Sequence, residues 1–261
     1  MQPVYGGDPA TKKRTEERSQ IAQEAQAGNV QARHRLQVIG AGKSVQYPSV
    51  EHHVATAKTV WLVASTVAEA QQAMQGLKAE AVELELADPS GIEATLGGAV
   101  VTRVIAKTAE QAQALLAMDA TFEVAVALSK GTAPWLLSLA EAPARLCIVQ
   151  PTHDRLTTAA SEDVELAGFF RDFALEVPVE GVPTCIASER ARATPSTLDA
   201  AMMTPQGELE IFRFARRYVQ SDYRVKSLRC KTCKYVGDCE GLHVNYVRAF
   251  GFAALQPVTD G

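Results

Sequence analysis

The middle of the chain alternates short apolar runs with amphipathic stretches that are rich in alanine. The run Val124-Ala125-Val126-Ala127-Leu128 is continuous, which is typical of a parallel strand that is buried on both faces. Amphipathic helices between such strands are the pattern of βα units. The predicted strands span residues 60–64, 81–86, 100–105, 122–128 and 146–149, each followed by a predicted helix, of which the one after residue 86 is short.

These βα units predict an α/β fold. Right-handed crossovers would curl successive units into a partial (β/α) barrel or an open parallel sheet, and five or six units are too few for an eightfold barrel. We predict three parts: an N-terminal helical arm at 1–45, the α/β partial barrel at 59–176, and a small cysteine-rich metal-binding lobe at 177–261. Further helices are expected at 163–173, 208–220 and 243–250, the last ending at Gly251.

Composition narrows the class of protein. The chain of 261 residues is 47% hydrophobic and 21% charged, as in soluble globular proteins. It has no apolar run near the roughly 20 residues that cross a bilayer, and its start lacks a signal-peptide core, so we expect a cytoplasmic protein without a membrane partner. A net charge of -4 argues against a surface built for nucleic acid.

The cysteines carry the strongest chemical signal. Five are present, and Cys230, Cys233 and Cys239 form the pattern CxxCxxxxxC, which lets thiolates converge on a metal. A fourth ligand is needed. Cys147 lies in an apolar run and is expected to be a buried hydrophobe, whereas Cys185 ends a loop stiffened by prolines. We therefore predict a 4Fe-4S cluster, with metal ligands Cys185, Cys230, Cys233 and Cys239.

A structural zinc site is the alternative. His243 follows Cys239 at the spacing of a CCCH finger, so the zinc ligands would be Cys230, Cys233, Cys239 and His243. Eight cations between residues 211 and 234 would then favour RNA or another acidic partner, although they would equally stabilise an anionic cluster. These cations are Arg213, Arg216, Arg217, Arg224, Lys226, Arg229, Lys231 and Lys234.

The spacing around the cysteines resembles a known family. Pro183-Thr184-Cys185-Ile186, the CxxCxxxxxC segment with Gly241, and then Tyr246, Gly251 and Pro257 resemble the C-terminal region of certain radical SAM proteins, over about residues 122–257. In those relatives the corresponding cysteines hold a 4Fe-4S cluster additional to the one that cleaves S-adenosylmethionine. The resemblance therefore implies the same four cysteines as cluster ligands.

The sequence lacks one motif that radical SAM enzymes share. The motif CxxxCxxC, which binds the catalytic cluster, is not present, and the first cysteine is Cys147. The chain should therefore not generate a radical by itself. By analogy with degenerate relatives, we expect an auxiliary or substrate-binding subunit that pairs with an active radical SAM enzyme and acts on a peptide or a small molecule.

A third hypothesis places catalysis in the α/β domain itself. His153 and Asp154 follow a predicted strand end, where α/β folds place active sites, and could form an acid–base pair. The sequence contains no GxSxG nucleophile motif. We therefore predict no catalytic residue in this chain. Catalysis by the α/β domain is kept as an alternative hypothesis.

Overall fold

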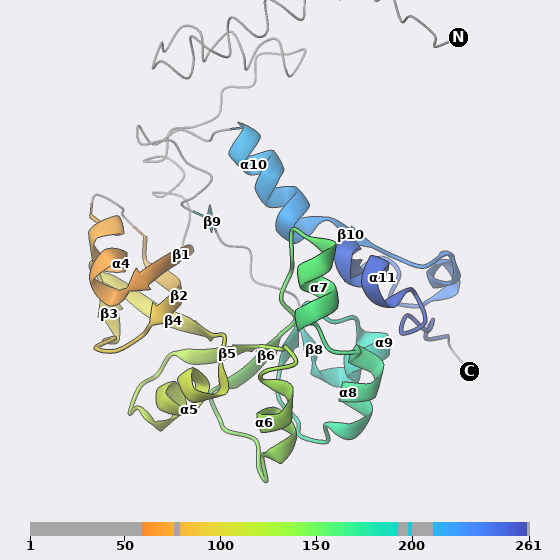
Figure 1. Ribbon diagram of the computed structural model, residues 1–261, viewed down its shortest axis with the longest axis horizontal. Helices are drawn as coiled ribbons and strands as arrows, with labels where there is room; N and C mark the ends of the chain where they lie inside the picture. The colour runs from red at the N-terminus through yellow and green to blue at the C-terminus, as the bar shows by residue number, and fades with distance from the viewer. Residues whose placement is uncertain (1–58, 76–78, 193–197, 200–210, 260–261) are drawn as a thin grey trace, which may run out of the picture. The chain divides into compact units, whose positions relative to one another are not determined.

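The computed structural model describes residues 59–75, 79–192, 198–199 and 211–259 (Figure 1). These residues all belong to one compact unit, Ser49–Gly261. The helical arm predicted at 1–45 lies outside the described residues. Within the described part of the chain, no helix has both the length and the apolar character needed to cross a membrane.

A mostly parallel sheet forms the core of this unit. Its parallel strands lie side by side in chain order, and the sheet does not close on itself, so the prediction of a partial barrel or an open parallel sheet is confirmed. All five predicted strands are present. The parallel strands are β1 (Thr59–Thr66), β2 (Ala81–Asp88), β4 (Ala99–Ala106), β5 (Glu123–Ala127), β6 (Leu146–Val149), β7 (Val179–Glu180), β8 (Ala191–Arg192) and, beside β1, β9 (Leu198–Asp199).

Helices connect most of these strands. Helices α5, α6 and α8 lie on one side of the sheet, whereas α7 lies beside α11 (Figure 1). Thr66 and Thr108 cap α4 and α5 by accepting hydrogen bonds from the backbone. The helices are α4 (Val67–Ala73), α5 (Ala109–Ala117), α6 (Ala133–Ser138), α7 (Leu156–Glu162), α8 (Leu166–Asp172) and α9 (Thr184–Ala187).

The short helix predicted after residue 86 is wrong. A two-residue strand, β3 (Thr95–Leu96), occupies this connection and pairs antiparallel with β4. Gly97 and Gly98 join the two strands with φ of 58° and 89°. A type I′ two-residue hairpin turn requires positive φ at both positions, and the glycine pair therefore favours the hairpin over a helix.

The C-terminal segment forms a small lobe beside the sheet. It contains α10 (Ile211–Arg217), a π-helical turn (Tyr218–Asp222), β10 (Arg224–Val225), a 3₁₀ turn (Leu228–Thr232), β11 (Leu242–His243) and α11 (Val244–Phe250). Strands β10 and β11 pair antiparallel. The helices predicted at 208–220 and 243–250 are confirmed within their described parts, and Gly251 ends α11 with φ of 76°.

Hydrogen bonds join this lobe to the sheet domain. The hydroxyl of Tyr246 in α11 accepts a bond of 3.0 Å from the backbone N–H of Leu166, at the start of α8. The side-chain amide of Asn245 donates to the carbonyl of His153 at 2.8 Å. Strands β7 and β8, which lie after the predicted boundary at 176/177, pair with β6 and with each other. The sheet therefore extends into the segment predicted as the cysteine-rich lobe.

Candidate metal centre

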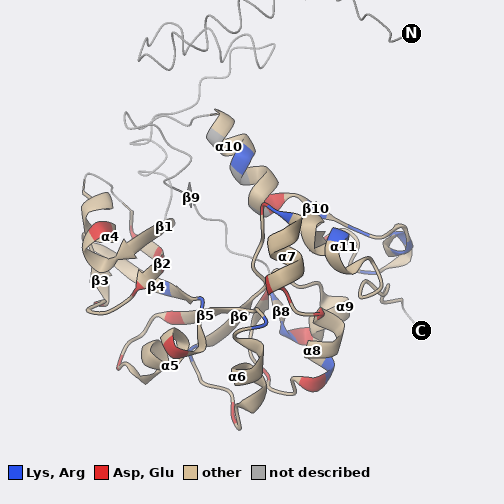
Figure 2. Cartoon of the chain, in the orientation of Figure 1, with Lys and Arg blue, Asp and Glu red and all other residues tan. Residues whose placement is uncertain are grey.

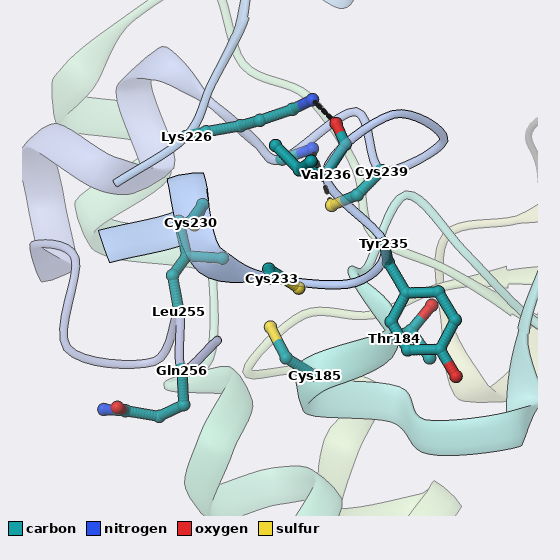
Figure 3. A pocket seen from close by; sticks show the side chains of 11 residues that line it. Thr184, Cys185, Lys226, Cys230, Cys233, Tyr235, Val236, Cys239, Leu255 and Gln256 are labelled. Atoms are coloured by element: carbon teal, nitrogen blue, oxygen red, sulfur yellow. Dashed lines mark hydrogen bonds between the residues drawn. The ribbon is translucent and has the colours of Figure 1, made fainter. Parts of the chain in front are cut away.

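Four cysteines from two distant segments line one pocket (Figure 3). Cys185 comes from α9, whereas Cys230, Cys233 and Cys239 come from the loop between β10 and β11. The pocket holds about 360 Å³ of empty space, including solvent at its mouth. None of the four is in a disulfide, and Figure 3 shows the sulfurs of Cys185 and Cys233 turned toward each other. The structure thus brings together the four residues that were predicted as ligands.

The CxxC segment places two thiols on one side of a turn. Ser227 caps the 3₁₀ turn by accepting a hydrogen bond of 3.3 Å from the N–H of Arg229, and the N–H of Cys233 donates to the carbonyl of Cys230 at 3.1 Å. Side chains three residues apart are eclipsed in a 3₁₀ helix. Cys230 and Cys233 therefore share one face of this turn.

Gly241 allows the chain to return tightly behind Cys239. Its φ is +83°, and a Cβ atom there would lie 2.2 Å from the backbone oxygen of Val225. Its N–H donates to the sulfur of Cys239 at 3.3 Å. Only glycine combines this φ with so close an approach of two backbone segments. Gly241 therefore lets the chain fold back behind Cys239.

Backbone groups also reach the other sulfurs. The N–H of Val258 donates to the sulfur of Cys233 at 3.4 Å, and the backbone of Gln256 hydrogen-bonds to Cys185. Burial raises the pKa of the Cys185 thiol, the Gln256 bond opposes that rise, and the neighbouring cysteines add to it. A bound metal ion or cluster would offset this rise at Cys185, because its positive charge favours the thiolate.

Four cysteine thiolates suit a 4Fe-4S cluster, in which each thiolate binds a different iron. Among the described residues, the group of three or more potential ligand atoms within 4.8 Å of one another is Glu123, Cys147 and Glu180, and these three residues do not line the cysteine pocket.

His243, the fourth ligand of the predicted zinc set, does not line this pocket. Its side chain is buried at the start of α11, where Nδ1 accepts a hydrogen bond of 3.4 Å from the N–H of Asn245. Its Nε2 lies 3.2 Å from the carbonyl oxygen of Val219. Burial lowers the pKa of His243. Both ring nitrogens therefore have protein partners, and the structure groups Cys185 with the other cysteines.

Cations surround the cysteine loop, as Figure 2 shows along β10 and α11. Lys226 lines the pocket and donates to the carbonyl of Val236 at 2.7 Å. Arg224 is largely buried, and its Nη1 donates to the carbonyls of Gly181 at 2.9 Å and Gly241 at 3.1 Å. Arg224 therefore ties the loop that leads to Cys185 to the loop that follows Cys239.

A second charged cluster, which the sequence did not predict, is formed by side chains of β2, β4, β5, β7 and β8. Arg103 donates to Glu180 at 2.6 Å, and Arg192 bridges Glu180 and Glu123 with contacts of 2.5 Å each. Glu83 lies opposite Arg103 in the register of β2 and β4, and burial raises its pKa. Charged residues at alternate positions of apolar strands, as in β2, were the available signal.

Cys147 belongs to this charged cluster and not to the cysteine pocket. It is fully buried, as predicted, but its sulfur lies 3.2 Å from Nη2 of Arg192. Burial and the neighbouring carboxylates raise its pKa to about 12. The thiol is therefore protonated at neutral pH. With both arginines paired to Glu123 and Glu180, the arrangement is that of an ion-pair network.

The hypothesis that His153 pairs with Asp154 is wrong. Nε2 of His153 lies 3.1 Å from Oδ1 of Asp163, and this hydrogen bond raises the pKa of His153. Gln150 donates to the same oxygen at 2.9 Å. Adjacent residues in an extended loop point apart, whereas Asp163 returns to His153 through α7.

The geometry leaves the cysteine pocket as the strongest candidate site, with the four predicted ligands and backbone donors in place. The resemblance to radical SAM proteins rests on the residues quoted for it. Comparison of the chain with protein-family models, curated proteins and solved structures found no match.

Proposed function

We propose that this chain is a cytoplasmic iron–sulfur protein that holds one 4Fe-4S cluster and serves as an auxiliary or substrate-binding subunit beside an active radical SAM enzyme. The observation that carries the proposal is the meeting of Cys185 with the CxxCxxxxxC loop in one pocket. The ligands are Cys185, Cys230, Cys233 and Cys239.

The chemistry of the pocket supports a four-cysteine cluster. Backbone N–H groups donate to two of the sulfurs, those of Cys239 and Cys233. A cluster with four thiolates is anionic, and Lys226 and the largely buried Arg224 place positive charge beside it. These hydrogen bonds and cations lower the free energy of a reduced cluster. The zinc set that includes His243 is less well supported, because His243 does not line the pocket.

The subunit role rests on the sequence pattern and on an exposed apolar helix. Without CxxxCxxC the chain has no cluster with a free iron for S-adenosylmethionine, so a partner must supply the radical. Exposed apolar residues lie in α10 and in the turn after it. Large exposed apolar patches mark protein interfaces. These residues are Ile211, Phe214, Tyr218 and Val219, with exposed fractions of 39%, 42%, 49% and 54%.

The cluster is tested by oxygen-free purification and reconstitution. The protein should be brown, with about four iron and about four sulfide per chain, and reduction should produce an EPR signal. Cys185→Ala and Cys233→Ala should each lower the iron content strongly, while Cys147→Ala should keep it because that thiol lies elsewhere. A colourless protein after reconstitution would reject the proposal.

The zinc alternative is decided by the same preparation. His243→Asn preserves a side-chain acceptor at the start of α11 but removes the imidazole. Retention of metal by this variant, with loss in Cys185→Ala, supports the four-cysteine cluster. Loss of a colourless metal in His243→Asn, with retention in Cys185→Ala, supports zinc.

The subunit role has its own tests. The cluster-loaded chain, incubated with S-adenosylmethionine and a strong reductant, should release no 5′-deoxyadenosine. The protein isolated from its native source should co-purify with a second chain that contains CxxxCxxC. Reductive cleavage by this chain alone, or a native homo-oligomer, would overturn the subunit role and leave the cluster assignment standing.

A further inference from the structure

The outer surface of the cysteine loop is apolar at its centre. Leu228 is 82% exposed, and Val236 and Phe252 are each 41% exposed. Side chains of the segment that carries Leu228 hydrogen-bond to the backbone at the other two positions: Arg229 donates to the carbonyl of Phe252 at 3.2 Å, and Lys226 donates to the carbonyl of Val236 at 2.7 Å. We call Leu228, Val236 and Phe252 the apolar centre.

Positive charge surrounds the apolar centre. Between residues 224 and 259 the chain has six Lys and Arg residues against two acidic residues, a net charge of +4, whereas the whole chain carries -4. The cations are Arg224, Lys226, Arg229, Lys231, Lys234 and Arg248, and the acidic residues are Asp238 and Glu240. An apolar centre with a charged rim is the usual anatomy of a protein interface.

Two residues of this surface also line the cysteine pocket. Val236 of the apolar centre lines the pocket and is 41% exposed. Lys226 likewise lines the pocket and is exposed. A partner seated on the apolar centre would therefore be close enough to the proposed cluster to exchange electrons with it.

We propose that this surface docks an acidic one-electron carrier protein, which reduces the cluster. The proposal rests on the cluster assignment made above. One electron leaves the reduced carrier and enters the oxidised 4Fe-4S cluster; the carrier is oxidised by one electron, and no bond forms or breaks. Opposite charges steer the encounter, and a small interface with an apolar centre suits a transient complex.

The chemistry of the surface favours a protein over a nucleic acid. Leu228, the most exposed of the three apolar residues at 82%, is aliphatic and offers no stacking plane for bases, whereas the apolar patch of a protein would bury it. Asp238 and Glu240, in the same loop, would repel a phosphate backbone. An acidic protein with an apolar contact patch satisfies both the centre and the rim.

The test measures the rate of cluster reduction by a reduced, acidic 2Fe-2S ferredoxin under anaerobic stopped-flow conditions. The wild-type rate constant should fall steeply as salt is added. Lys231→Glu/Lys234→Glu should lower it roughly tenfold or more at low salt, and should weaken its salt dependence. Arg171→Glu reverses a charge on α8, on a side chain that is 76% exposed, and should leave the rate unchanged.

Iron and sulfide content, measured on every variant, separates this proposal from the cluster assignment. A wild-type protein without iron contradicts the cluster itself. Equal rates in the wild type and in a charge-reversed variant of full iron content overturn the docking proposal. Leu228→Ser provides the second variant because its exposed side chain makes no cluster contact; it should keep its iron and slow reduction, and an unchanged rate overturns the proposal.

Discussion

The sheet domain and the cysteine loop are stabilised in different ways. The strands bury a continuous apolar layer, in which Leu84, Val124 and Ile148 are completely inaccessible to solvent. In contrast, no described residue between Lys226 and Glu240 is buried, and these residues are held by turns, backbone hydrogen bonds and Arg224. Apolar burial therefore accounts for the sheet, whereas the loop lacks a core of its own and needs another source of order.

Because the cysteine loop lacks a buried core, we expect it to depend on metal binding for its structure. Small metal-bound segments obtain folding free energy from metal binding, because the ligands are assembled only in the folded state. The sheet does not need that contribution. Four distinct perturbations, from the most to the least disruptive, test how separate the two regions are.

Removing the proposed cluster should have the largest effect. After treatment with an iron chelator and an oxidant, we expect amide hydrogens in residues 226–240 to exchange with solvent much faster, while those of β4, β5 and β6 remain protected. Hydrogen exchange with mass spectrometry measures both regions in one sample. Faster exchange throughout the sheet, or unchanged exchange in the loop, would contradict the division.

Gly241→Ala should disrupt the loop without unfolding the sheet. A Cβ at position 241 would lie 2.2 Å from the backbone oxygen of Val225, so β10 or the Cys239 segment must shift. We expect loss of most of the bound iron, measured by elemental analysis, with the far-UV circular dichroism retained. Gly91→Ala is the matched control, because φ there is +76° but no atom lies within 4 Å of the added Cβ.

Arg103→Met should destabilise the sheet and spare the loop. Arg103 is 7% exposed and pairs with Glu180, which is 0% exposed, so the substitution leaves a buried carboxylate with fewer partners. Removing one member of a buried ion pair costs about 3–5 kcal/mol, which chemical denaturation of the sheet would measure. Lys107→Met, which removes an exposed partner of Glu85, should cost less than about 1 kcal/mol.

The sequence predicted features that depend on local pattern. The apolar runs located β1, β2, β4, β5 and β6, and the cysteine spacing with the Pro183 loop selected the four residues that line the pocket. The sequence did not reveal which charged residues meet across strands. Glu123 and Glu180 are 57 residues apart and share Arg192 only through the register of the sheet.

Contacts made by loops were also predicted less well, because they depend on how distant segments fold together. His153 was matched with its neighbour Asp154, but its partner is Asp163, which is brought back by α7. The hairpin at β3 depends on two glycines with positive φ, a local signal that was present but was not used. Local chemistry is readable from the chain. Among the long-range contacts of His153, the charged cluster and the cysteine pocket, the sequence predicted only the meeting of Cys185 with the cysteine loop, where a shared ligand chemistry marked the residues.

The smallest expected effect concerns the junction between the two regions. The hydrogen bond to Asp163 raises the pKa of His153 above its ordinary value of 6.5, so protonated His153 stabilises the folded state. That contribution is complete below about pH 6.5 and is lost as pH rises through the raised pKa of the folded state. Since Asn245 of α11 donates to the carbonyl of His153, this pH range should also affect attachment of the lobe.

His153→Gln tests this junction because it keeps a polar side chain and removes the titration. Thermal unfolding of the wild type should show a Tm that decreases from slightly acidic to slightly alkaline pH, and the variant should show a flatter profile over the same range. A control substitution, Asp154→Asn, should leave the wild-type profile in place, since the partner of His153 is Asp163. Parallel profiles for wild type and His153→Gln would show that this pair contributes no pH-dependent stability, and that attachment of the lobe depends on Tyr246 and Arg224 instead.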